Sequence, residues 1–433
     1  MLDLLDQGKG SELERGYVYG LIKYLEEGPV SAASAFRKVA KKFPNEIQAS
    51  VFASLFGRGG YDETGSATPT QQQSEEELAA LMKAHPDSPL PLNALLLIRA
   101  EAPDLSPSLD LARKLAQMAP DYPPYCHLVG HYQWRCGEHA AAAATFGQAA
   151  ARYEKWMQSS KTTFVDCAEW GKAECYRVVA LASKGDFDPA LAAAKRLAAT
   201  PLPQDRASSA GVRFMMWEAQ TLPARLLMRR GKSGDAALAL AALPATKTLK
   251  PFHQECLAYW WIDGLRIALE AQRLLEAGKP ADARKAVDAL AFHGERMAKA
   301  QSVANEGGER SAWTRSFRAL ELIASEVRGH LSLAGPENLR GTAYNWFRSA
   351  ADRQRPAVML YPPVVLSPML ARLGSYHLTE SKPEAAVEAY QDALVAFPND
   401  MEALQGLQRA YAAAKQPDKA AGIALKIKQL QGS

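Results

Sequence analysis

The order of small, large and aromatic apolar residues follows helical spacing, with neighbours on one face three or four positions apart. Near the carboxyl end, one such segment ends in Leu373-Gly374, and a second follows the polar turn at residues 381–383. The second segment carries Ala386 and Tyr390 and stops at Pro398. Glycine and alanine let two backbones approach closely, and proline cannot continue a helix. The pattern therefore predicts two antiparallel helices that pack closely at Gly374 and Ala386.

The same arrangement recurs along the chain. It returns 34 residues later, where Ala420 takes the place of Ala386. It also recurs near the amino end and near residue 140, at Gly20, Ala32, Phe36 and Pro44, and at Gly130, Ala142, Phe146 and Ala149. In the middle of the chain the polar turns lie further apart, which predicts hairpins with extended helices. These spacings predict about nine helical hairpins.

This pattern resembles the tetratricopeptide repeat (TPR), a unit of two antiparallel helices with a period of about 34 residues. The resemblance implies an all-α fold, an α-α superhelix in which the first helix of each hairpin lines a concave face where partners usually bind. The expected fold class is therefore a TPR-like α-solenoid of about nine hairpins, some of them with extended helices.

Two segments also resemble those of a group of uncharacterised bacterial TPR proteins. One contains Pro362-Pro363, Pro368 and Leu373-Gly374, and the other is the series His127, His131 and Arg135. In that group, as in this chain, the two histidines and the arginine precede an alanine-rich second helix. This resemblance implies an architecture and assigns no activity.

The repeat pattern is interrupted twice. Residues 57–76 are polar and rich in glycine, and a segment with so little to bury is typical of a flexible loop. Residues 353–368 hold four prolines, which exclude a regular helix and predict an extended crossing. The expected organisation is N-terminal hairpins at 1–56, the polar loop at 57–76, repeats with a His/Arg stripe at 77–158, extended-helix repeats at 159–352, the Pro-rich crossing at 353–368, and a C-terminal repeat pair with its cap at 369–433.

The composition is typical of a soluble helical protein. Hydrophobic residues make up 48% of the chain, and alanine, the best helix former, dominates them. The net charge of +4 comes without a block of like charges, so charge gives no argument for nucleic acid. Five cysteines without regular spacing predict free thiols. Neither a membrane-spanning segment nor a signal peptide is predicted, so a cytoplasmic location is expected, or a periplasmic one if a signal peptide has been removed.

The candidate binding residues lie close together in sequence. His127, His131 and Arg135 are each four residues apart and share one stripe of a helix, with Trp134 beside them. The position of Gly130 predicts that this stripe faces the concave groove. Imidazole, guanidinium and indole groups suit an anionic or aromatic ligand.

Three interpretations of the stripe remain open. It contacts a bound peptide or protein, or its histidines only bond to neighbouring helices, or His127 and His131 hold a metal ion. Two histidines four apart can chelate zinc, but the chain lacks a His-Glu-x-x-His motif and a paired Cys-x-x-Cys. A second basic group, Arg225 with Arg229 and Arg230, is explained by a favourable interaction with the carboxyl end of a helix.

The sequence contains no nucleophile elbow, phosphate-binding loop or dinucleotide fingerprint. It predicts a non-enzymatic scaffold or adaptor, without catalytic residues or a cofactor. A protein or peptide partner is expected to bind the concave face at His127, His131, Trp134 and Arg135. The alternative is a protein that binds a metal or a small ligand through His127 and His131 in the same groove.

Overall fold

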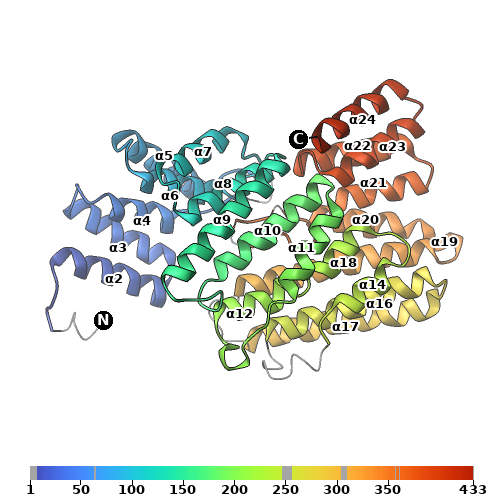
Figure 1. Cartoon of the computed structure of the whole chain (residues 1–433), viewed down its shortest axis with the longest axis horizontal. Helices are drawn as coiled ribbons and strands as arrows, with labels where there is room; N and C mark the ends of the chain where they lie inside the picture. Colours follow the sequence, from blue (N-terminus) through green and yellow to red (C-terminus); the bar gives the residue numbers. More distant parts are fainter. Residues whose placement is uncertain are drawn as a thin grey trace. The chain divides into compact units, whose positions relative to one another are not determined.

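The computed structural model describes residues 7–62, 65–245, 256–303, 310–355, 357–359 and 361–432. Throughout these residues the chain forms helices that follow one another as antiparallel pairs (Figure 1). Among the described residues, the only β-type pairing is an isolated antiparallel bridge between Tyr61 and Ala67. The chain divides into two compact units, Met1–Tyr132 and Gln133–Ser433. None of the described helices combines the length and the apolar character needed to cross a membrane.

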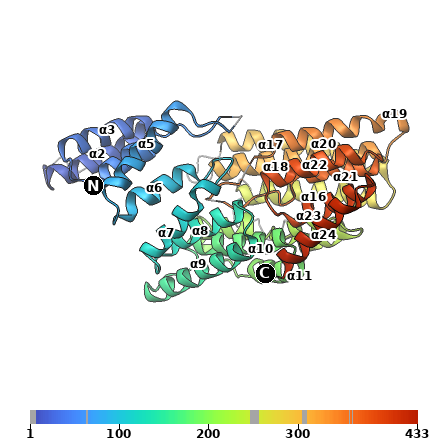
Figure 2. The same cartoon turned by 90° about the horizontal axis from the view of Figure 1, so that it is seen from above.

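Unit 1 is a row of short helices. They are α2 (Glu12–Glu27), α3 (Pro29–Lys42), α4 (Ile47–Gly57), α5 (Pro69–Ala84), α6 (Pro89–Arg99), η1 (Ser106–Ser108), α7 (Leu109–Met118) and most of α8 (Pro123–Arg135) (Figure 2). Gly20 of α2 lies against the buried ring of Phe36 of α3, where a Cβ atom would be 2.7 Å from a ring carbon. Only a residue without a side chain fits where these two helices cross.

The loop predicted over residues 57–76 is shorter than expected, because its second half is helical. α4 ends at Gly57 and α5 begins at Pro69. The Thr68 hydroxyl caps α5 by accepting a hydrogen bond from the amide of Gln71. A proline at the first helical position costs nothing, since its missing amide would have had no partner there. The polar residues after Thr68 therefore belong to a capped helix start.

Unit 2 contains the longer helices and one extensive hydrophobic core. Its elements are α9 (His139–Ser159), α10 (Ala168–Lys184), α11 (Phe187–Ala198), η2 (Gln204–Arg206), α12 (Ala210–Phe214), the π-helical turn η3 (Met215–Ala219), α13 (Leu222–Arg230), α14 (Asp235–Ala242), α16 (Leu257–Glu276), α17 (Pro280–Val303), α18 (Arg310–Leu333), α19 (Glu337–Arg340), α20 (Thr342–Arg353), α21 (Met369–Thr379), α22 (Pro383–Ala396), α23 (Met401–Ala413) and α24 (Pro417–Gln431).

The C-terminal helices pack as the repeat pattern predicts. The ring of Tyr390 on α22 is 1% exposed and lies against Gly374 of α21 and Gly406 of α23, where Cβ atoms would be 2.8 and 2.0 Å from ring carbons. Ala386 is fully buried in the same cluster. One tyrosine thus fills the groove between two consecutive hairpins, as the TPR pattern requires. The fold is an all-α, TPR-like superhelix, and the predicted fold class is confirmed.

The proline-rich segment between α20 and α21 lies inside unit 2. We call residues 354–368 the crossing segment; Pro356 and Leu360 within it lie outside the described residues. Its described residues form no helix, and Ala357, Val358, Val364 and Leu366 are each at most 8% exposed. The crossing segment is therefore part of the core of unit 2.

Candidate functional site

The four predicted binding residues share helix α8, and all of them are buried. The exposed fractions are 8% for His127, 0% for His131, 5% for Trp134 and 8% for Arg135. The boundary between the two units falls within the same helix, after Tyr132. The stripe exists as predicted on one helix, but its side chains do not line an open surface.

In unit 1, α8 holds the end of α6. The Nε2 atom of His131 lies 3.2 Å from the carbonyl oxygen of Ala100, and the Tyr132 hydroxyl donates to the carbonyl of Leu96 at 2.8 Å. The last turn of a helix leaves its carbonyls without intrahelical partners. These two side chains therefore satisfy backbone groups where α6 ends.

In unit 2, the remaining residues of the stripe are also engaged. The indole nitrogen of Trp134 donates to the Ser183 hydroxyl at 3.1 Å, and its ring packs edge-on against Tyr176. Arg135 donates to the carbonyl of Ala357 at 3.2 Å. These contacts support the interpretation in which the stripe bonds to neighbouring segments. Direct binding of a partner by its four residues stays a prediction.

The crossing segment is held by side chains from the first helices of several hairpins. Arg135, Tyr176, Arg225 and Arg229 donate hydrogen bonds to its backbone. Arg135 donates to the carbonyl of Ala357, and Tyr176 donates to those of Val358 and Tyr361. Arg225 donates to the carbonyls of Pro363 and Val364, and Arg229 donates to that of Leu366. An extended buried segment needs such donors, because its carbonyls have no neighbouring strand to pair with. Side chains of these helices are thus engaged by another segment of the same chain.

Arg225 and Arg229 do not form the basic helix edge that the sequence predicted. Both are buried, with exposed fractions of 3% and 9%. Arg225 pairs with the Glu218 carboxylate at 2.5 Å and Arg229 with Asp400 at 2.7 Å. Burial raises the pKa of Glu218, although Arg225 acts in the opposite direction. The prediction was wrong because a helix-dipole argument considers one helix alone, whereas these guanidinium groups bond to segments that are distant in sequence.

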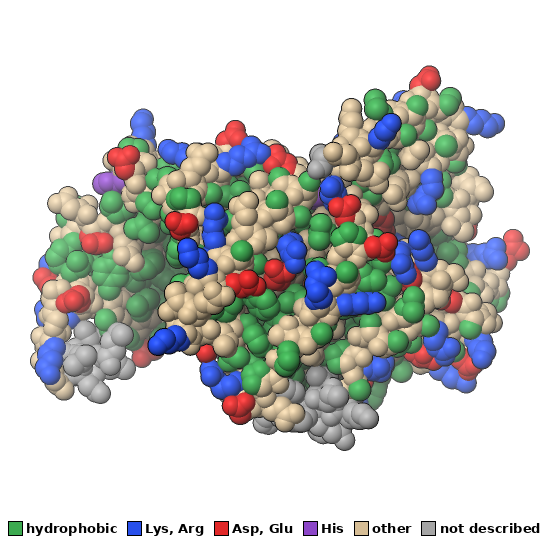
Figure 3. Space-filling model, viewed as in Figure 1, with side chains coloured by type: hydrophobic (Ala, Val, Ile, Leu, Met, Phe, Trp, Pro, Cys, Tyr) green, Lys and Arg blue, Asp and Glu red, His purple; other side chains and the backbone are tan. Residues whose placement is uncertain are grey.

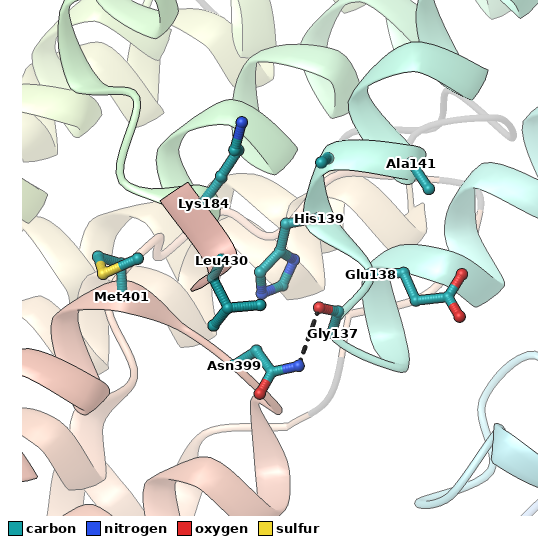
Figure 4. A pocket seen from close by; sticks show the side chains of 9 residues that line it. Gly137, Glu138, His139, Ala141, Lys184, Asn399, Met401 and Leu430 are labelled. Carbon is teal, nitrogen blue, oxygen red and sulfur yellow. Dashed lines mark hydrogen bonds between the residues drawn. The ribbon is translucent and has the colours of Figure 1, made fainter. Parts of the chain in front are cut away.

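A cavity of about 230 Å³ lies in unit 2 where α9 begins (Figure 4). Its walls come from the first turn of α9, the end of α10, the turn before α23, and α24. The lining residues are Gly137, Glu138, His139, Ala140, Ala141, Lys184, Asn399, Met401 and Leu430. The amide of Asn399 donates to the carbonyl of Gly137 at 3.2 Å, which ties the two turns together. Segments more than 250 residues apart in sequence therefore build one cavity.

His139 is the one titratable side chain that is buried at this cavity among its described lining. It is 7% exposed, and both of its ring nitrogens are shut off from solvent. Its pKa is lowered to about 4, first because burial removes the charged form from water and second because Arg229 is close. The Pro398 carbonyl acts in the opposite direction. The imidazole is therefore neutral at pH 7 and offers one N–H donor and one acceptor.

A metal ion has no prepared site in the part of the chain that the structure describes. No group of three or more His, Cys, Asp or Glu side chains is arranged there to hold one. The metal-binding alternative through His127 and His131 is therefore not favoured.

No motif in the sequence indicated this cavity. His139, Asn399, Met401 and Leu430 belong to none of the candidate sites that the sequence analysis named. The useful hint is the proline at position 398 followed by a polar turn, since such a turn is rigid and exposes side chains. It says nothing, however, about which distant segment it meets.

Comparison with known proteins adds little beyond the fold. No protein-family model matches the chain, and no curated protein matches it. Similar solved structures include Naa15/Naa10 bound to HypK-THB, with 12% identity, a TM-score of 0.30, and coverage of 98% of this chain and 64% of that chain. A human IFIT1 dimer with m7Gppp-AAAA has 10% identity, a TM-score of 0.38, and coverage of 100% and 94%. The TPR domain of P58(IPK) has 14% identity, a TM-score of 0.24, and coverage of 94% and 99%.

This chain thus spans 64% of the length of the matched chain in the Naa15/Naa10 structure. At these identities and scores, the resemblance carries no argument about partners or activity. The assignment of the fold rests on the geometry of this chain, above all on the position of Tyr390 between Gly374 and Gly406.

Proposed function

We propose that this protein is a non-enzymatic scaffold that binds a partner protein, and that the partner docks on α2 and the start of α3. The observation that carries the proposal is a run of exposed large apolar side chains in residues 19–30. They are Tyr19, Leu21, Tyr24, Leu25 and Val30, with exposed fractions between 42% and 80%. Figure 3 shows hydrophobic side chains reaching the surface at this end of the chain.

The position of α2 in the row explains why it is exposed. α2 packs on α3 and touches α4 through Tyr17 and Tyr24, whose rings meet Phe52 and Phe56. Among its 16 residues only Gly20 is buried, whereas the internal helix α6 buries six of its 11. α2 therefore exposes the kind of apolar side chains that α6 buries.

The other end of the repeat array makes a useful contrast. α24 also has no buried residue, but its exposed face carries Lys419, Lys426 and Lys428. Among the described exposed large apolar side chains, α24 contributes only Leu425, at 58%, whereas α2 and the start of α3 contribute five. The exposed apolar side chains of α2 are suited to a helix with an apolar stripe supplied by the partner, because helices α2 to α6 of this unit cover one another by stacking.

For the α8 stripe we propose a framework role within this scaffold. His131 supports the end of α6, and Arg135 holds the crossing segment. The stripe would then act on binding only through the stability of the units that present the docking surface.

The proposal is tested with a matched pair of variants. Leu25 and Val395 are both 80% exposed, on α2 and on α22. Partners would be captured from a lysate of the native host with three proteins: wild type, Leu25→Glu and Val395→Glu. Any captured protein would then be purified, and its binding to each of the three would be measured by calorimetry. We expect Leu25→Glu to weaken binding by at least about tenfold, or about 1.4 kcal/mol, and Val395→Glu to leave it unchanged. Equal binding by both variants, or no partner, would overturn the proposal.

A further inference from the structure

The outer face of α2 carries a regular apolar pattern. Four residues at positions i, i+3, i+4 and i+7 share this face; they are Val18, Leu21, Ile22 and Leu25, which we call the α2 stripe. The face around Gly20 packs on α3 instead. Leu21 and Leu25 are exposed, at 42% and 80%, and α2 is the outermost described helix of its row (Figure 1). The α2 stripe therefore lies where a further helix of the array would pack.

Two oppositely charged side chains flank the α2 stripe. Arg15 and Glu26 are separated by about three helical turns, so they lie on the same side of it. Among the described residues, Arg15 donates only to the backbone carbonyls of Gly8 and Gly10, and Glu26 has neither a hydrogen-bond nor an ion-pair partner. The other charged groups of α2 are engaged within the chain: Glu12 with Lys42, Glu14 with Ser11, and Lys23 with Glu27. Arg15 and Glu26 are therefore the charges that an incoming helix can meet.

The α2 stripe and its flanking charges match a second copy of themselves. In an antiparallel pair of α2 helices centred near Leu21, Val18 of one copy lies beside Leu25 of the other. The same pairing brings Arg15 of one copy beside Glu26 of the other. Both contacts occur twice, because a two-fold axis makes the interface use the same surface on each chain. A parallel pair would instead place Arg15 beside Arg15, so the charges favour the antiparallel pair.

No other surface of the described residues offers such a face. Outside residues 19–30, each exposed large apolar side chain is the only one on its helix or turn. They are Leu90, Tyr122, Trp156, Leu238, Phe292, Tyr344, Val395 and Leu425. A single exposed apolar side chain is normal, whereas a continuous apolar patch marks an interaction site. Within this chain, the helix face that suits the α2 stripe is therefore that of α2 itself.

We propose that the partner docked on α2 is a second copy of this chain, held by an antiparallel α2–α2 pair. The inference rests on the proposed function, since it takes α2 as the docking surface and adds the identity of the occupant. Burial of the α2 stripe supplies the attraction, and the two Arg15–Glu26 pairs fix the antiparallel orientation. The assembled scaffold is then a symmetric dimer with two copies of every other surface.

Sedimentation equilibrium of the full chain tests whether the dimer forms. We expect the mass to rise from that of one chain towards that of two between about 1 and about 200 µM, with a Kd on the order of 10 µM, since a pair of single helices is a small interface. Leu25→Glu should weaken the dimer at least about tenfold, and Val395→Glu should leave its Kd unchanged. A wild-type chain that stays monomeric at every concentration, or a Leu25→Glu dimer as tight as wild type, rules the proposal out.

Charge reversal tests the antiparallel pairing. Arg15→Glu or Glu26→Arg alone places like charges in both pairs, so each variant should dimerise at least about tenfold more weakly than wild type. Mixing the two variants in equal amounts should restore the dimer, because each contact between positions 15 and 26 then joins opposite charges again. Each variant is checked for folding by its melting curve. A mixture that dimerises as weakly as the separate variants would contradict the antiparallel pair.

The proposed function can stand without this inference. If the chain is monomeric and Leu25→Glu loses a different captured host protein, α2 remains a docking surface and the second copy is wrong as its occupant. If Leu25→Glu keeps both the dimer and every captured protein, both proposals are wrong.

Discussion

Arg229 and Asp400 form a buried ion pair across 171 residues of sequence, with Nη2 and Oδ2 2.7 Å apart. The same guanidinium donates to the carbonyl of Leu366 in the crossing segment. Asp400 in turn accepts hydrogen bonds from the amides of Glu402 and Ala403 and so caps α23. One pair of side chains therefore joins α13, the crossing segment and the last two hairpins.

Removing one partner of this pair should be strongly destabilising. Asp400→Ala leaves a buried, uncompensated guanidinium and an uncapped helix, which we expect to lower the free energy of unfolding by about 3–5 kcal/mol. All eight tryptophans lie in unit 2, so urea denaturation followed by tryptophan fluorescence measures the unfolding of the unit that contains the pair.

The matched control is Asp352→Ala. Asp352 pairs with Arg348, but both side chains are about half exposed, at 54% and 49%. An exposed pair of this kind contributes less than about 1 kcal/mol. Equal destabilisation by the two variants would mean that the Arg229–Asp400 pair does not hold the C-terminal hairpins.

The framework role of the α8 stripe can be tested at Arg135. Arg135→Met keeps much of the apolar stem but leaves the buried carbonyl of Ala357 without its donor, so we expect a loss of about 1–3 kcal/mol. Hydrogen exchange of the amides in residues 357–368 should become faster in this variant. Arg353→Met, at an exposed position, is the control and should change neither quantity. An Arg135→Met protein as stable as wild type would instead favour the open binding groove that the sequence predicted.

How much of the structure can be predicted from the sequence depends on how far apart the interacting residues lie along the chain. Gly374, Ala386 and Tyr390 lie within 17 residues, counting both ends, so their spacing was enough to predict a hairpin and its packing. His127, His131 and Arg135 were correctly placed on one helix for the same reason. Their burial could not be predicted, because Ala100 and Ala357, which they contact, belong to other parts of the chain.

The crossing segment shows the same limit in a different form. Its four prolines excluded a helix, but they did not indicate that Arg225 and Tyr176 would donate to its carbonyls. A sequence shows that an extended segment lacks internal hydrogen bonds. It does not show which side chains replace them, since these come from any element that the superhelix brings near.

The turn at Gly137 makes a second close contact with the C-terminal hairpins. Gly137 has a φ of +80°, and a Cβ atom there would lie 2.5 Å from the carbonyl oxygen of Pro398. Gly278 has a similar φ of +68°, but a Cβ atom there would meet nothing within 4 Å. Gly278→Ala should therefore cost only the strain of a left-handed residue, about 1–2 kcal/mol. Gly137→Ala should cost clearly more, because it also pushes the turn at residues 398–399 away. Urea denaturation of both variants checks this, and equal losses would argue against a close contact at Gly137.

The stability of unit 2 should depend on pH through His139. The pKa of this side chain is about 4 in the folded protein, against 6.5 for an unperturbed histidine. Between these two values the unfolded chain binds a proton that the folded protein resists, so stability falls as the pH is lowered from about 6.5 to about 4. The difference between the two pKa values corresponds to about 3 kcal/mol of stability. The folded protein has lost this amount in full below about pH 4 and has lost none of it well above about pH 6.5. Burial also lowers the pKa of His293 and His377, which adds to the loss in the same direction.

A comparison of wild type with His139→Leu isolates the contribution of His139, because all the other histidines are common to both proteins. At pH 7 the imidazole is neutral, so any difference in stability between the variant and wild type there is independent of its protonation. As the pH falls towards 4, urea denaturation should show the variant gaining about 3 kcal/mol over wild type. Parallel curves would mean that His139 takes up a proton in the folded protein as easily as in the unfolded one. The ring would then lie in contact with water, contrary to its buried position at the start of α9.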